Sequence, residues 1–144
     1  IYQNPEDIPI NHGFSVLREG KDLFIIATGR MVYNALLVSD YLRAQSISVG
    51  VIDLFRIKPF NRSAIWEIVK KSPYLMTLEE HSLIGGIGSA VAEMLSIKSH
   101  IPQFKPLGIP DEFCKEYGAR EYLRSLYRMD VSSLQKLIVK WLKK

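Results

Sequence analysis

The chain has 144 residues, of which 47% are hydrophobic and 24% are charged, as is ordinary for one soluble globular domain. No segment approaches the ~20 consecutive apolar residues that a membrane-spanning helix needs. The formal net charge of +4 is too small to indicate nucleic-acid binding by itself. The single cysteine, Cys114, excludes an internal disulfide and favours a reducing, cytoplasmic location.

The N-terminal segment is polar and contains two prolines. Residues 1–12 are predicted to form a linker or an extended arm, followed by one domain at residues 13–144. The segment has no starting Met and lacks the basic and then apolar regions of a signal peptide. We therefore expect the chain to be cut from a longer protein, with a natural small subunit as the alternative.

Apolar runs alternate with segments of helical spacing through the first half of the domain. In chain order the pattern predicts strands at residues 14–17 and 23–28, a helix from 31 to about 45 and a strand at 48–53. The continuous apolar run at residues 23–28 is typical of a strand that is buried on both faces. Asn61 is a good N-cap for a helix that ends near Lys71.

The second half continues the same alternation. It predicts a strand at residues 74–79, a helix after the glycines at 85–88, a strand at 103–107 and helices at about 119–127 and 131–142. Asp130 is a good N-cap for the last helix. The alternation predicts an α/β fold, with a mostly parallel five-stranded sheet between two layers of helices and right-handed crossovers.

The most specific segment is the stretch at residues 77–93, where a buried strand ends in a polar corner and glycines lead into a helix. Sites form at the carboxyl ends of parallel strands, and helix N-termini attract anions. One hypothesis is phosphate binding at Gly85, Gly86 and Gly88, although neither a GxGxxG nor a Walker pattern is present. A second is acid–base chemistry by Glu80 and His81. We favour a third, a structural corner in which these residues make local hydrogen bonds and interdomain contacts.

Four segments in order resemble the C-terminal domain of the transketolase family. They are the Glu-Glu-His and double-glycine signature at residues 77–93, the first parallel strand at 22–29, the strand and Lys-Pro corner at 51–59, and the Gly-Ile-Pro-Asp segment at 107–113. The resemblance extends from about Gly13 to Leu142. His81 after the paired glutamates is more similar to transketolases, especially split ones, than to 1-deoxyxylulose-5-phosphate synthases, which more often have asparagine there.

The resemblance implies that the cofactor is held by other domains of a parent enzyme. In this family thiamine diphosphate and Mg²⁺ lie between a pyrimidine-binding and a diphosphate-binding domain, on opposite subunits of a dimer. No catalytic, cofactor-binding or metal-binding residue is therefore assigned to this chain. The implied partners are those two domains, within a homodimer or a heterotetramer, without nucleic acid or membrane.

The implied reaction is the transfer of a two-carbon ketol unit between sugar phosphates, to which this domain contributes structure and dimerisation. One alternative is the same domain of a 1-deoxyxylulose-5-phosphate synthase, which condenses pyruvate with glyceraldehyde 3-phosphate. Another is a stand-alone module that binds a phosphate or a nucleotide at the glycine turn. A third is an interaction subunit of a multienzyme assembly, as in the β chains of 2-oxo acid dehydrogenases.

Basic residues become frequent towards the C-terminus. Arg120, Arg124 and Arg128 recur every four residues, the spacing of one helical face if the helix extends that far. We favour a solvated face over a basic stripe that binds an acidic partner or nucleic acid. Trp141 follows apolar residues at helical spacing and is predicted to lie in the core or in an interface.

Overall fold

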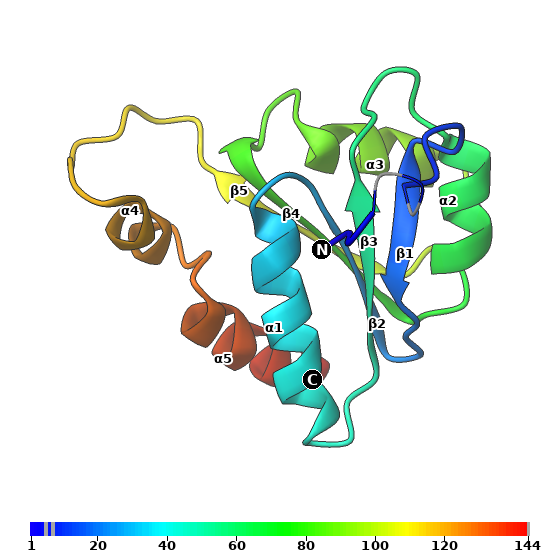
Figure 1. Cartoon of the computed structure of the whole chain (residues 1–144), viewed down its shortest axis with the longest axis horizontal. Coiled ribbons are helices and arrows are strands. Elements are labelled where there is room, and N and C mark those ends of the chain that lie inside the picture. Colours follow the sequence, from blue (N-terminus) through cyan, green and yellow to red (C-terminus); the bar gives the residue numbers. More distant parts are fainter. Residues whose placement is uncertain (5, 7, 144) are drawn as a thin grey trace.

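Five strands form one sheet in the order β1-β3-β2-β4-β5 in the computed structural model, which describes residues 1–4, 6 and 8–143 (Figure 1). The strands are β1 (Phe14–Arg18), β2 (Leu23–Ala27), β3 (Val49–Leu54), β4 (Tyr74–Ser82) and β5 (Gln103–Ile109). β1 pairs antiparallel with β3, and the other three pairings are parallel. The predicted mostly parallel sheet of five strands is confirmed.

Helices cover both faces of the sheet, which gives three layers (Figure 1). The helices are α1 (Met31–Arg43), α2 (Arg62–Val69), α3 (Ile87–Ser96), α4 (Arg120–Leu126) and α5 (Val131–Leu142), and α4 contributes no residue to the two core clusters. On β2, Leu23 and Ile25 pack with α1 and α5, whereas Phe24 and Ile26 pack with α2 and α3. Because successive strand residues point to opposite faces, a strand covered on both sides has to be apolar throughout.

The predicted helix caps are confirmed. The Asn61 side chain accepts a hydrogen bond from the backbone N–H of Ala64 at 3.4 Å, and Asp130 accepts one from Ser133 at 3.0 Å. Each cap satisfies an amide that has no partner within its helix. None of the helices in the described part of the chain is long and apolar enough to cross a membrane.

β4 extends beyond its predicted end at residue 79 and continues to Ser82. The register shifts between Leu78 and Ser82, but Ser82 still pairs with Ile109, so β5 also extends beyond its predicted end at residue 107. β4 is prolonged by three polar residues, Glu80, His81 and Ser82, which the apolar pattern does not recognise as strand. This extension places Glu80 and His81 of the corner on a strand, and the glycines follow in the turn and at the start of α3.

The predicted arm at residues 1–12 contacts the domain through Tyr2, whose hydroxyl donates a 2.9 Å hydrogen bond to the Asp53 carboxylate. Asp53 lies near the carboxyl end of β3. Residues 5 and 7 of the arm lie outside the described residues. The boundary at residue 13 stays a prediction.

The carboxyl ends of β2 and β4 lie side by side at the point where the strand order reverses. After β2 the chain crosses through α1 to β3, whereas after β4 it crosses through α3 to β5 on the other side. Open α/β sheets commonly form sites in the crevice at such a switch point. The glycine corner after β4 opens directly onto it.

Candidate functional site: the glycine corner after β4

Glu79 caps helix α3 from the neighbouring strand. Its carboxylate accepts hydrogen bonds from the backbone amides of Ile87 at 2.8 Å and Gly88 at 2.9 Å, while the residue itself is only 2% exposed. The N-cap residue of α3, Gly86, has no side chain that could do this. The carboxylate therefore satisfies two amides that would otherwise lack partners and lies at the positive end of the helix dipole.

The glycines make room for this carboxylate. A Cβ added to Gly86 would lie 2.3 Å from Oε2 of Glu79, and one added to Gly108 would lie 2.8 Å from the His81 carbonyl oxygen. A Cβ on Gly88 would lie 2.9 Å from Pro106. Gly86 and Gly108 thus approach β4 and its glutamate, and Gly88 approaches β5, more closely than a residue with a side chain would allow.

Gly85 serves the turn itself. Its φ of +77° lies in the left-handed region, and no atom would lie within 4 Å of an added Cβ. The Ser89 hydroxyl closes the loop, because it accepts from the Gly85 amide at 3.0 Å and donates to the Leu83 carbonyl at 2.9 Å. The corner is thus held by hydrogen bonds within the chain.

Glu80 points to the opposite face of β4 and anchors α4. Its Oε1 accepts hydrogen bonds from Nε of Arg120 at 3.0 Å and from Nε of Arg124 at 2.6 Å. Burial acts to raise the pKa of Glu80, but the hydrogen bonds from the two arginines outweigh it and hold that pKa below its usual value. The carboxylate stays ionised and bound to the two arginines, which makes Glu80 a poor general base.

The three arginines do not form one helical face. Arg124 is only 6% exposed because its guanidinium packs against Glu80. Arg128 is not on the helix, since α4 ends at Leu126 and Arg128 has a left-handed φ of +57°. The prediction of a solvated face is wrong for Arg124, because a sequence shows the spacing of charges but not the acid that they meet across the fold.

His81 is exposed, and its Nδ1 lies 3.2 Å from the Ser82 carbonyl oxygen. With Glu80, Arg30 and Arg120 it lines an open cavity of about 370 Å³ at the switch point between β2 and β4. The structure brings the five residues of the predicted corner together around this cavity and around Glu79. No group of three metal-ligating side chains occurs among residues 1–4, 6 and 8–143.

The sequence analysis missed Glu79, the buried member of the glutamate pair. A signal for it exists: two adjacent glutamates on a strand must point to opposite faces, and the face of Thr77 is apolar further back, at Leu75. A glutamate that is buried on that face needs hydrogen-bond donors, and the amides of the glycine turn supply them. The amides that a phosphate would need are thus already occupied.

A family model described as the transketolase C-terminal domain matches residues 13–134. The chain belongs to this family. Among curated relatives, a "putative transketolase C-terminal section" of Methanocaldococcus jannaschii is 37% identical over 100% of this chain and 45% of its own length. A 6-deoxy-6-sulfo-D-fructose transketolase subunit of a Clostridium species is 37% identical over 83% of this chain and 37% of its own length.

Members of the family also include longer enzymes. A 1-deoxy-D-xylulose-5-phosphate synthase of Heliobacterium modesticaldum is 33% identical over 90% of this chain, which spans only 20% of that enzyme. This transketolase C-terminal domain thus spans less than half of the two transketolase relatives and about a fifth of the synthase.

Solved structures give the same family and fold. A split-gene transketolase, described as an inactive β4 tetramer, superposes with a TM-score of 0.85 and 34% identity over 99% of this chain and 46% of that one. A transketolase of Campylobacter jejuni superposes with a TM-score of 0.69 over 92% of this chain and 19% of that one. Its identity of 18% makes it evidence for the fold alone.

Replacing the buried carboxylate tests its role as a cap. Glu79→Gln should lower the free energy of unfolding by about 2 kcal/mol, because a charge-assisted pair of hydrogen bonds is lost in a buried setting. Glu93→Gln is the matched control, since Glu93 lies on the same helix but in an exposed ion pair with Arg62, and should cost less than about 1 kcal/mol. Urea denaturation measures both, and equal losses would contradict the capping role.

The ion pairs of Glu80 with Arg120 and Arg124 should be lost in acid. A pKa that is lowered in the folded state contributes stability above its usual value of 4.5 and loses it as the pH falls through the folded pKa. We expect amide hydrogen exchange in α4 to become faster as the pH falls through the folded pKa of Glu80, while the amides of β2 stay protected. Arg124→Ala should cause the same opening at neutral pH, and Arg120→Ala much less, because the Arg120 side chain is 62% exposed. Acid opening of all elements together would argue against a local network.

Proposed function

We propose that this chain is the non-catalytic C-terminal domain of a cytoplasmic, thiamine-diphosphate-dependent enzyme of the transketolase type. The parent enzyme transfers a two-carbon ketol unit between sugar phosphates. Thiamine diphosphate and Mg²⁺ are held by the pyrimidine- and diphosphate-binding domains, and this domain stabilises their assembly into a dimer or a heterotetramer. Glu80, His81, Gly85, Gly86 and Gly88 form a structural corner that holds its docking surface.

The observation that carries this proposal is the occupied helix N-terminus of α3. A stand-alone phosphate or nucleotide module needs free amides at its glycine turn, whereas Glu79 takes the amides of Ile87 and Gly88. Displacing a buried carboxylate to admit a phosphate is costly, because the carboxylate then needs a new partner. The glycine turn therefore serves packing better than it serves a ligand.

A set of exposed apolar side chains favours docking as the role of the domain. We define the carboxyl-end surface by the exposed apolar residues of the loops after β3, β4 and β5, namely Phe55, Ile57, Ile84, Phe113 and Tyr117. Phe113 is 95% exposed and Tyr117 is 94% exposed. These loops lie along one end of the sheet, the upper rim of Figure 1. Large apolar side chains that gather at one end of a domain mark an interaction site.

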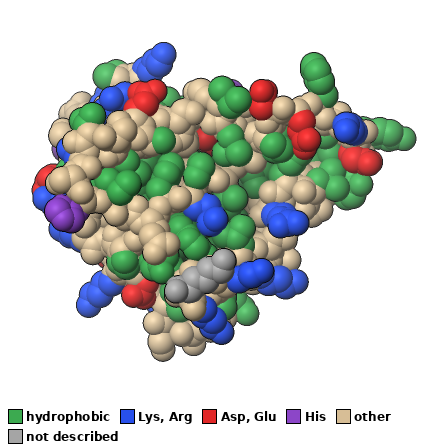
Figure 2. Space-filling model, turned by 180° about the vertical axis from the view of Figure 1, so that it is seen from behind, with side chains coloured by type: hydrophobic (Ala, Val, Ile, Leu, Met, Phe, Trp, Pro, Cys, Tyr) green, Lys and Arg blue, Asp and Glu red, His purple; other side chains and the backbone are tan. Residues whose placement is uncertain are grey.

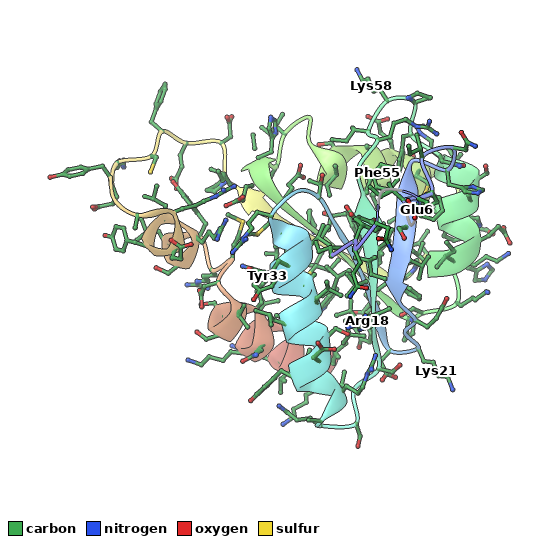
Figure 3. All side chains as sticks on the ribbon, in the orientation of Figure 1. Glu6, Arg18, Lys21, Tyr33, Phe55 and Lys58 are labelled. Carbon is green, nitrogen blue, oxygen red and sulfur yellow. The ribbon has the colours of Figure 1, made fainter. Side chains whose placement is uncertain are left out.

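The labelled side chains show the two ends of the sheet. Lys58 projects from the tip of the loop after β3, at the same end as Phe55, whereas Lys21 lies at the opposite end (Figure 3). The occupant proposed for the carboxyl-end surface is the cofactor-binding part of the same enzyme. The relatives' greater length supports this choice, since this chain spans 45% of the transketolase section and 20% of the synthase.

We rank ketol transfer as the first candidate reaction because the transketolase section matches over 100% of this chain, whereas the 1-deoxyxylulose-5-phosphate synthase matches over 90%. The sequence identities to the two relatives, 37% for the transketolase section and 33% for the synthase, differ little. The 1-deoxyxylulose-5-phosphate synthase reaction is therefore the second candidate. An assay of the complete enzyme with a ketose phosphate donor, and separately with pyruvate and glyceraldehyde 3-phosphate, distinguishes the two.

Calorimetry with thiamine diphosphate tests the proposed role of the chain. The complete enzyme should bind the cofactor in a Mg²⁺-dependent manner, whereas this chain alone should give no heat of binding and no ketol transfer. Adding the missing part to this chain should restore both. Cofactor binding by the chain alone would contradict a non-catalytic role, and no binding by the complete enzyme would contradict the enzyme class.

Single substitutions at the two ends of the sheet test the docking surface. Ile84→Asp should weaken association with the cofactor-binding part by about tenfold or more, because it places a charge in an apolar contact. Ile97→Asp is the matched control, because Ile97 is also well exposed, at 76% against 65% for Ile84, but follows α3 at the other end of the sheet. Ultracentrifugation of each variant mixed with the cofactor-binding part measures their association. Equal weakening by both variants would contradict the assignment of the carboxyl-end surface as the docking site.

A further inference from the structure

A basic cleft lies where α5 passes the edge strand β5. It has a volume of about 450 Å³ and is lined by Lys105, Arg128, Ser133, Lys136, Leu137, Lys140 and Trp141. Four of these residues are cations, and none is acidic. We call this set of residues the basic cleft. Small-molecule sites in proteins have volumes of roughly 300–1,000 Å³, so the cleft has the size of a ligand site.

None of the four cations pairs with an anionic side chain among residues 1–4, 6 and 8–143. In the described part of the chain no carboxylate forms an ion pair with the side chain of Lys105, Arg128, Lys136 or Lys140, whereas Lys70 pairs with Glu67 and Arg120 with Glu80. Like charges that converge on one concavity repel one another and raise the local potential. A bound anion would relieve this repulsion.

The cations come from three places in the fold. Lys105 lies on β5, Arg128 lies between α4 and α5, and Lys136 and Lys140 are one turn apart on α5. They surround one hollow instead of following a line, which suits a small ligand better than the backbone of a nucleic acid. Seen from behind, blue side chains gather around green ones in the lower half of the molecule (Figure 2).

Trp141 gives the cleft an aromatic wall. The Lys105 ammonium lies 5.2 Å from the centre of the indole ring, and Tyr74 packs edge-on against the same ring at 5.0 Å. Tyr74 and Leu137 hold the indole against the core around α5. The ring is therefore fixed before any ligand arrives, and a planar or apolar part of a ligand can lie against it.

We propose that the basic cleft binds a small molecule that carries a diphosphate or two phosphate groups next to a planar or apolar part. The lysines and Arg128 neutralise the phosphates, and Trp141 contacts the remainder. The cleft shares no lining residue with the glycine corner or with the carboxyl-end surface, and Arg128 also lines the adjoining cavity next to Phe113. The inference does not depend on the reaction of the parent enzyme.

Calorimetry with inorganic pyrophosphate and with ADP, at constant ionic strength, tests this site on the chain itself. Both probes should bind saturably, and ADP more tightly because it also offers a ring. Lys136→Gln combined with Lys140→Gln should weaken binding by about tenfold or more, and Lys105→Gln by about fivefold. Lys98→Gln is the matched control, since Lys98 lies 5.1 Å from the ring of the other tryptophan, Trp66, and its loss should change affinity by less than about twofold.

A fluorescence readout locates the ligand. The sequence has two tryptophans, so Trp66→Phe leaves Trp141 as the reporter, and its emission should change with the same midpoint as the heat of ADP binding. No saturable binding of either probe, equal loss from Lys98→Gln and Lys105→Gln, or an unchanged Trp141 signal would each overturn the proposal. Binding confined to vesicles of phosphatidylcholine and phosphatidylserine, or to an RNA oligomer, would overturn it as well.

Discussion

The architecture around the candidate site depends on one carboxylate placed at the start of one helix. Glu79 is buried at the end of β4 and accepts hydrogen bonds from the first amides of α3. A buried carboxylate is stable only with such partners, and these amides have none within their own helix. The strand, the glycine turn and the helix therefore have to be in place together.

Neighbouring features follow from this contact. Gly86 has to lack a side chain because a Cβ would meet the carboxylate, and Gly108 brings β5 equally close to β4. The alternation of the strand then directs Glu80 to the other face, where it holds Arg124 and with it α4. Adjacent glutamates thus hold α3 and α4, one through each face of β4.

The sequence predicted much of the fold, because each buried strand is a short apolar run and the caps at Asn61 and Asp130 are local signals. It did not predict the extension of β4 to Ser82, since pairing with β5 outweighs the polarity of these residues. It also drew attention to Glu80 and His81 and passed over Glu79, whose burial depends on which face of the strand α3 covers. Arg124 was misjudged for a related reason: its partner lies 44 residues away in the chain.

These contacts bear directly on function, because a helix N-terminus filled by the chain's own carboxylate does not offer its amides to a ligand. Nuclear magnetic resonance of the Ile87 and Gly88 amides during a phosphate titration tests this most directly. In the natural chain the two resonances should not move, whereas in Glu79→Ala, where the amides lose their partner, they should shift as phosphate is added. Shifts in the natural chain, at phosphate concentrations that leave the fold intact, would contradict the account and make the glycine turn a ligand site.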